Sequence, residues 1–167
     1  MAYFFLHPTM RLRVRQLERE LHAPLPSVIR YARELEKEGI LKTSEIGGSR
    51  LYSADRSSPS FLLEKRLSNI RSLYASGLVA FLKEEYNGPA IVLFGSYARG
   101  EDVENSDIDI YVESGRGKEG GIPRFEKALG RKIHVMSAEN LRSISNKGLA
   151  NNIINGLILS GYVEVFK

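Results

Sequence analysis

The sequence predicts an α+β fold built from two small domains. Early in the chain, apolar residues recur at helical spacing, with Val14, Leu17 and Leu21 on one stripe. Strand patterns come later: residues 90–94 are wholly apolar, and residues 106–112 alternate between polar and apolar. The 167 residues are 43% apolar and 26% charged, a balance typical of chains that bury a core. We therefore expect helices and a hairpin first, followed by a domain that combines strands with helices.

The first domain is expected over residues 1–56. Its predicted elements are a helix ending near His22, a helix over residues 26–38, and strands at residues 40–44 and 50–53. Gly47 and Gly48 lie between the two strands and permit the positive φ angles of a tight hairpin turn. This part of the chain holds ten basic residues against seven acidic ones, an excess that is compatible with a nucleic-acid partner.

This pattern of helix, turn, helix and hairpin resembles the winged helix-turn-helix of archaeal and bacterial regulators over residues 8–55. The resemblance implies that the second helix enters the major groove of double-stranded DNA, and that the protein binds as a homodimer. Winged helices also serve as protein-interaction modules, so that alternative stays open. The residues that the resemblance assigns to DNA contacts are Ser27, Arg30, Tyr31, Arg33, Lys37, Ser49 and Arg50.

A second domain is expected over residues 57–167, after a linker at residues 54–60 that is rich in serine. A long connecting helix is predicted over residues 61–86, with Gly77 as its weak point. Ser137 is predicted to be the N-cap of a helix that starts at Ala138. The other expected elements are a helix over residues 122–129 and a strand over residues 132–136. Residues 151–167 are expected to hold the end of a helix followed by a strand or a hairpin around Ser160 and Gly161.

Composition excludes several classes of protein. The longest apolar runs fall well short of the roughly 18 to 20 residues that span a bilayer, so we expect no membrane segment. No signal peptide is recognisable, which predicts a cytoplasmic protein. The chain has no cysteine and only three histidines, a composition that argues against a structural zinc site. Any metal ion is therefore expected to be held by carboxylates.

The segment from Gly95 to Asp109 carries the chemistry. Asp107 and Asp109 stand two residues apart on a predicted strand, so their side chains share a face with Cα atoms about 7 Å apart. Two adjacent carboxylates repel each other unless a cation lies between them, and Mg²⁺ suits such ligands. Gly95 and Ser96 follow an apolar strand directly, where backbone N–H groups at a strand-to-helix turn can hold phosphate.

An apolar strand, Gly-Ser, ten further residues and Asp-x-Asp on a second strand together resemble the DNA polymerase beta-like nucleotidyltransferase superfamily, particularly its minimal branch. The resemblance covers residues 61–167 and implies an α/β domain with a mixed sheet. It also implies that Gly95, Ser96 and Arg99 bind a nucleoside triphosphate. Asp107 and Asp109 would hold one or two Mg²⁺ ions while a nucleotidyl group passes to a hydroxyl of a protein or a nucleic acid such as RNA.

The superfamily takes a third acid from the next strand, yet here His134 occupies that place. One interpretation makes His134 a catalytic base or a neighbour of the metal ion; the other makes it a polar residue of a domain that has lost transfer activity. The nearby acids Glu101, Glu104 and Glu113 do not match the pattern and are expected to be solvated.

Three functions follow from these alternatives. The first is a DNA-binding protein with an active nucleotidyltransferase domain. The second is a transcription regulator whose impaired nucleotidyltransferase fold is a nucleotide sensor or dimerisation module. The third is the antitoxin-like member of a toxin–antitoxin pair, because minimal nucleotidyltransferases resemble one half of such pairs.

Overall fold

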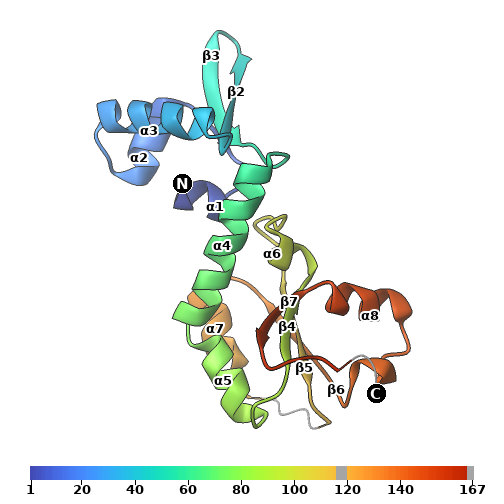
Figure 1. Cartoon of the computed structure of the whole chain (residues 1–167). Coiled ribbons are helices and arrows are strands. Elements are labelled where there is room, and N and C mark those ends of the chain that lie inside the picture. Colours follow the sequence, from blue (N-terminus) through green and yellow to red (C-terminus); the bar gives the residue numbers. More distant parts are fainter. Residues whose placement is uncertain (116–119, 165–167) are drawn as a thin grey trace. The chain divides into compact units, whose positions relative to one another are not determined.

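A computed structural model of the chain describes residues 1–115 and 120–164. The chain forms two compact units, Met1–Ser68 and Asn69–Lys167, and each is described by itself (Figure 1). The division falls inside the helix α4 (Pro59–Ala75) and not at residues 56 and 57, where the sequence places it. Phe61 explains the difference, because this α4 residue is only 1% exposed and packs its ring against Phe5 of the first unit. Lys65 likewise donates to the carbonyl oxygen of Phe5 at 2.7 Å.

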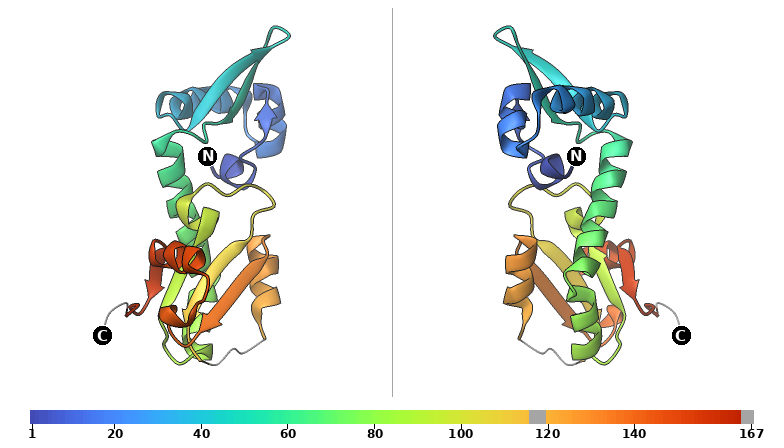
Figure 2. Two further views of the ribbon diagram at one scale, coloured as in Figure 1. Left: turned by 90° about the vertical axis from the view of Figure 1, so that its right-hand side faces the viewer. Right: turned by 90° about the vertical axis from the view of Figure 1, so that its left-hand side faces the viewer.

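The first unit combines helices with a small antiparallel sheet. Its elements are α1 (Ala2–Leu6), β1 (Arg11–Leu12), α2 (Val14–Leu21), α3 (Leu25–Lys37), β2 (Leu41–Ile46), β3 (Ser49–Ala54) and the start of α4. The strands lie in the order β1-β3-β2. Figure 2 shows the β2–β3 hairpin extending beyond the helices of this unit. The two predicted helices and both strands of the hairpin are confirmed.

Local chemistry explains where these elements end. α2 stops because His22 adopts the left-handed conformation with φ of 50°, and Pro26 then lies in the first turn of α3. Gly47 and Gly48 turn the hairpin with φ angles of 57° and 68°, as predicted. Leu17, with 1% of its surface exposed, anchors α2 in a core formed with the other helices and the sheet.

The second unit is built on a mixed sheet. Its elements are the end of α4, then α5 (Leu78–Glu85), β4 (Ile91–Phe94), α6 (Gly95–Arg99), β5 (Ile108–Glu113), α7 (Ile122–Leu129), β6 (Ile133–Ala138), the 3₁₀ turn η1 (Leu141–Ser143), α8 (Lys147–Ile154) and β7 (Leu157–Ser160). The strand order is β6-β5-β4-β7. β5 and β6 run parallel, whereas β4 is antiparallel to both of its neighbours. The predicted α+β class and the predicted mixed sheet are therefore confirmed.

Helices cover both faces of this sheet, with α5 and α7 on one face and α8 on the other (Figure 1). The first face buries a larger apolar core, which includes Ile108 and Ile110 of β5. The second buries a smaller cluster, in which Tyr111 of β5 packs with Ile153 of α8. Within the described residues, 1–115 and 120–164, every helix is too short or too polar to cross a membrane.

Two predicted elements differ from the structure. The connecting helix over residues 61–86 is broken between α4 and α5, because Gly77 takes a φ of 81° that α-helical residues do not adopt. Ser137 is not an N-cap but a residue of β6, which continues to Ala138 in order to pair with Glu113. The caps of the two following helical segments are Asn140 and Asn146, whose side chains accept from the N–H groups of Ser143 and Leu149.

Candidate functional site

The turn between β4 and α6 brings the predicted phosphate cradle against an acid. Phe94 is extended, and Gly95 then reverses the chain with a φ of 77°, in the left-handed region that favours glycine. A Cβ atom at Gly95 would lie only 2.5 Å from Oδ2 of Asp109. Glycine is therefore required twice, for its backbone angle and for the space that the carboxylate occupies.

Asp107 and Asp109 stand at the entrance of β5. Asp107 precedes the strand and is exposed, whereas the Asp109 side chain keeps 32% of its surface exposed. Burial raises the pKa of Asp109; nearby His134 opposes the shift, and the negative charge of Asp107 adds to it. A cation placed between the two carboxylates would stabilise their ionised forms, because it offsets both the burial of Asp109 and the repulsion from Asp107.

His134 lies beside these acids because β5 and β6 are parallel. The register sets His134 opposite Asp109, and Nδ1 of the imidazole lies 3.9 Å from Oδ1 of the carboxylate. The His134 side chain is 76% exposed. The strand next to β5 thus brings an imidazole to the place where the superfamily pattern expects a third carboxylate.

The donor set fits one hard divalent ion. Asp107 and Asp109 supply carboxylate oxygens, which Mg²⁺ prefers, and the close approach of Gly95 leaves the Asp109 carboxylate facing the phosphate cradle. In the described part of the chain, no three acidic or histidine side chains are already gathered as a metal site. Asp107 is exposed, so its side chain is free of buried packing on the side from which a metal ion would enter.

The other predicted nucleotide residues lie on α6. Ser96 follows Gly95 in the first turn and is half-buried. Arg99 is exposed at the end of the helix, where its Nε donates to Oε2 of Glu101 at 2.7 Å. Arg99 would have to exchange this partner in order to reach a phosphate. Nucleotide binding by Ser96 and Arg99 stays a prediction.

A buried polar network holds the loop between α6 and β5, and the sequence analysis missed it. Asp102 accepts from Nδ2 of Asn69 at 2.8 Å and pairs with Nη2 of Arg131 at 3.1 Å. The side chains of Asp102 and Arg131 are 0% and 6% exposed. Nη1 of Arg131 also donates to the carbonyl oxygens of Val103 and Ser106. The network therefore fixes the segment that leads directly into Asp107.

Glu113 is a correction to the sequence analysis, which expects it to be solvated. Its Oε2 is buried and has no hydrogen-bond partner among the described residues, and the same is true of the hydroxyl of Tyr111. Burial raises the pKa of Glu113, and the charge of Glu164 raises it further. Burial, with the charge of Glu113, raises the pKa of Tyr111 to about 12. The face of β5 that is partly open at Asp109 is thus buried at Tyr111 and half-buried at Glu113.

The predicted DNA-contacting residues all lie in the first unit, and the predicted nucleotide residues all lie in the second. Ser27, Arg30, Tyr31, Arg33 and Lys37 are on α3, and Ser49 and Arg50 begin β3. All except the two serines are exposed. The guanidinium of Arg30 lies 4.7 Å from the centre of the Tyr31 ring, and its Nε lies 4.0 Å from Glu34.

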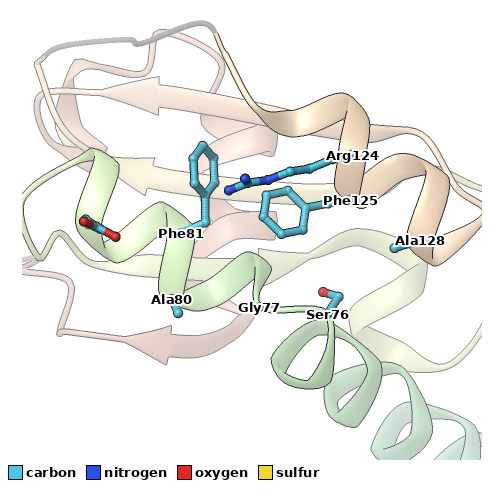
Figure 3. A pocket seen from close by; sticks show the side chains of 8 residues that line it. Ser76, Gly77, Ala80, Phe81, Arg124, Phe125 and Ala128 are labelled. Atoms are coloured by element: carbon cyan, nitrogen blue, oxygen red, sulfur yellow. The ribbon is translucent and has the colours of Figure 1, made fainter.

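A separate pocket of about 480 Å³ lies on the α5 and α7 side of the second unit (Figure 3). The guanidinium of Arg124 lies over the rings of Phe81 and Phe125, at 4.9 and 4.6 Å from their centres. These helices cover the sheet face opposite to the one that carries Asp109. The pocket is therefore not part of the site at Gly95 and Asp109.

Comparison with known proteins agrees with this geometry. The family model described as "Nucleotidyltransferase domain" matches residues 75–159. A protein of Methanocaldococcus jannaschii, provisionally named a protein adenylyltransferase, is 38% identical over 104 residues, which cover 56% of this chain and 97% of that protein. Another of the same name and organism is 36% identical over 70 residues, 39% of this chain and 75% of that protein.

A third such protein is 66% identical over 32 residues, which cover 19% of this chain and 37% of that protein. No solved structure matches the chain. The matched family residues lie wholly within the part of the molecule that carries the glycine turn, the two acids and the mixed sheet. The resemblance to the nucleotidyltransferase superfamily is thereby confirmed, and the chain belongs to the nucleotidyltransferase domain family.

Proposed function

We propose that the second unit transfers an adenylyl group from ATP to a hydroxyl of a protein, with a divalent metal ion. The contact between Gly95 and the Asp109 carboxylate supports this most directly, because it sets the turn that we propose to bind phosphate against the acid that we propose to bind the metal ion. The names of the Methanocaldococcus relatives favour ATP as the donor and a protein as the acceptor. An RNA hydroxyl is the other acceptor that the chemistry allows.

In the proposed step, the acceptor oxygen attacks the α-phosphorus of ATP and forms the new P–O bond. The bond from that phosphorus to the oxygen shared with the β-phosphate breaks, pyrophosphate leaves with the electron pair, and the hydroxyl proton passes to solvent. The backbone N–H groups at Gly95 and Ser96 would hold the terminal phosphates. Asp107 and Asp109 would hold the metal ion, which neutralises charge on the phosphates when it is bound.

The test is transfer of label from ATP in a cell extract from the source organism. With [α-³²P]ATP and Mg²⁺, we expect a labelled protein; with [γ-³²P]ATP we expect none, because the γ-phosphate leaves in pyrophosphate. Asp109→Asn should abolish the labelling, whereas Glu84→Gln, at an exposed acid of α5 on the other side of the sheet, should retain it. If ATP binds but no protein or RNA acquires the α-label, the transfer activity is refuted and the nucleotide sensor replaces it.

We further propose that the first unit is a winged helix-turn-helix that binds double-stranded DNA as a homodimer. Support comes from the order α1-β1-α2-α3-β2-β3, in which a hairpin follows two successive helices. Arg33 and Lys37 are exposed on the second of these, α3. Both can contact DNA phosphates or bases.

Fluorescence anisotropy with a DNA duplex tests the binding. We expect Arg33→Gln combined with Lys37→Gln to weaken it and to flatten its salt dependence. Lys83→Gln combined with Lys127→Gln, in the second unit, is the matched control and should bind normally. Equal binding by both double variants would refute the DNA contact of α3. A regulator that senses nucleotide should also show different curves with and without Mg-ATP, and sedimentation velocity should show a dimer.

A further inference from the structure

We propose that His134 is a nitrogen ligand of the metal ion, and that the site consequently prefers a first-row transition-metal ion such as Mn²⁺ over Mg²⁺. This inference rests on the proposed function, because it concerns the metal ion that accompanies the nucleotide. It goes further by assigning a role to the residue in which this chain departs from the pattern of its superfamily.

The geometry allows one ion to contact both side chains. Parallel pairing of β5 with β6 sets His134 opposite Asp109, with Nδ1 and Oδ1 separated by 3.9 Å. Metal–ligand distances at nitrogen and oxygen are about 2.1 Å, so two atoms at this separation can both lie within bonding distance of a single ion.

The exposure of the side chains allows the final adjustment. His134 is 76% exposed, and Asp109 keeps 32% of its side chain exposed. Asp107, one residue before β5, is exposed as well. The exposed His134 and Asp107 side chains can rotate without disrupting buried packing, whereas the Asp109 carboxylate lies against Gly95 and the strands that carry Asp109 and His134 are fixed by their ladder.

The chemistry of the ligands then decides which ion is preferred. Mg²⁺ favours oxygen ligands and gives up its water molecules reluctantly. Replacement of a third carboxylate by a neutral imidazole removes one negative charge, which weakens the attraction for a hard ion. First-row transition ions accept imidazole nitrogen more readily than Mg²⁺ does. Their affinity for the site therefore falls less than that of Mg²⁺ when an imidazole replaces the carboxylate.

Electron paramagnetic resonance on the full chain tests the assignment. The probe is Mn²⁺ together with α,β-methylene ATP, which binds without transfer. We expect a ¹⁴N coupling to Mn²⁺ in the spin-echo modulation, and we expect ¹⁵N-histidine labelling to convert it to a ¹⁵N coupling. His134→Asp and His134→Gln should remove the coupling. His7→Gln alters a histidine of the first unit and should leave it unchanged.

Competition with Mg²⁺ measures the preference. The concentration of Mg²⁺ that displaces half of the bound Mn²⁺ should be about tenfold lower in His134→Asp than in the wild type, because a third carboxylate restores the oxygen ligands. Bound Mn²⁺ without nitrogen coupling, or equal displacement in the two proteins, would overturn this inference and leave the proposed function intact. Failure of the wild type to bind Mn²⁺ with the nucleotide would overturn both.

Discussion

The two faces of β5 differ sharply although they belong to one strand. Ile108, Ile110 and Val112 point to one face, and each is 0% exposed in the larger apolar core. Asp109 and Tyr111 occupy the other face. This face is partly exposed to solvent at Asp109, whereas α8 covers it at Tyr111. The first face contributes only carbon atoms to its core, whereas the second buries polar atoms.

One face of β5 thus contributes to the stability of the fold, and the other carries the ionisable side chains. Burial on the apolar face stabilises the protein, since carbon leaves water favourably. On the polar face burial raises the pKa of Asp109 and of Glu113, so the ionised forms are disfavoured in the folded state. Substitutions on the two faces should therefore affect different properties.

The largest effect is expected at the open end of the polar face. Asp109→Asn should lower α-label transfer at least about 1,000-fold, because a metal ligand is lost. The melting temperature should be unchanged or slightly higher, since the substitution removes a charge that burial disfavours. Transfer rates and thermal melts of the same preparation check both expectations. A variant that unfolds easily would show that Asp109 also stabilises the fold.

The network that supports this open end should be next in magnitude. Arg131→Met removes the guanidinium that pairs with the buried Asp102 carboxylate, which should cost about 4 kcal/mol of unfolding free energy. Urea denaturation measures this loss. In a double-mutant cycle, adding Asp102→Asn should recover part of it, because the buried negative charge that Arg131 pairs with is then removed as well. Purely additive losses would mean that the ion pair does not couple the two residues.

Much of the local structure around the candidate site was predictable because its residues are close in sequence. The apolar strand before Gly95 and the alternation around Asp109 indicate their structures through local spacing. The helix over residues 122–129 was predicted with its observed bounds, because Gly130 ends it in the left-handed conformation. These elements are determined by residues that are close in sequence, so the local pattern is enough to predict them.

Features that depend on distant pairing were not predictable. Asn69, Asp102 and Arg131 come from three separate segments, and no sequence spacing predicts that their side chains are in contact. The burial of Glu113 likewise depends on packing beyond its own strand. Ser137 looks like a cap locally, but pairing of β6 with β5 takes it into the sheet. Tertiary contacts decided each of these cases.

Substitution on the apolar face should have the opposite effect to Asp109→Asn: it should lower stability and leave transfer activity unchanged. Ile110→Ala creates a cavity in a fully buried position and should cost about 3 kcal/mol of unfolding free energy. Transfer activity per folded molecule should stay close to that of the wild type. Ile158→Ala, at a position that is 53% exposed, is the matched control and should change stability by less than about 0.5 kcal/mol. Urea denaturation and transfer assays below the midpoint check both properties.

The smallest effect is expected at the closed end of the polar face, where Glu113 has a raised pKa. Between its ordinary value of 4.5 and the higher folded-state value, the folded protein binds more protons than the unfolded one, so stability falls as pH rises. Glu113→Gln cannot ionise and should be more stable than the wild type at pH 7, by less than about 1 kcal/mol, with no difference below about pH 4. Thermal melts from pH 4 to 8 measure this, with Glu164→Gln expected to give a smaller gain because only the secondary cause is removed. A loss of stability in Glu113→Gln at pH 7 would instead mean that the ionised carboxylate of Glu113 is favourably bound in the folded protein.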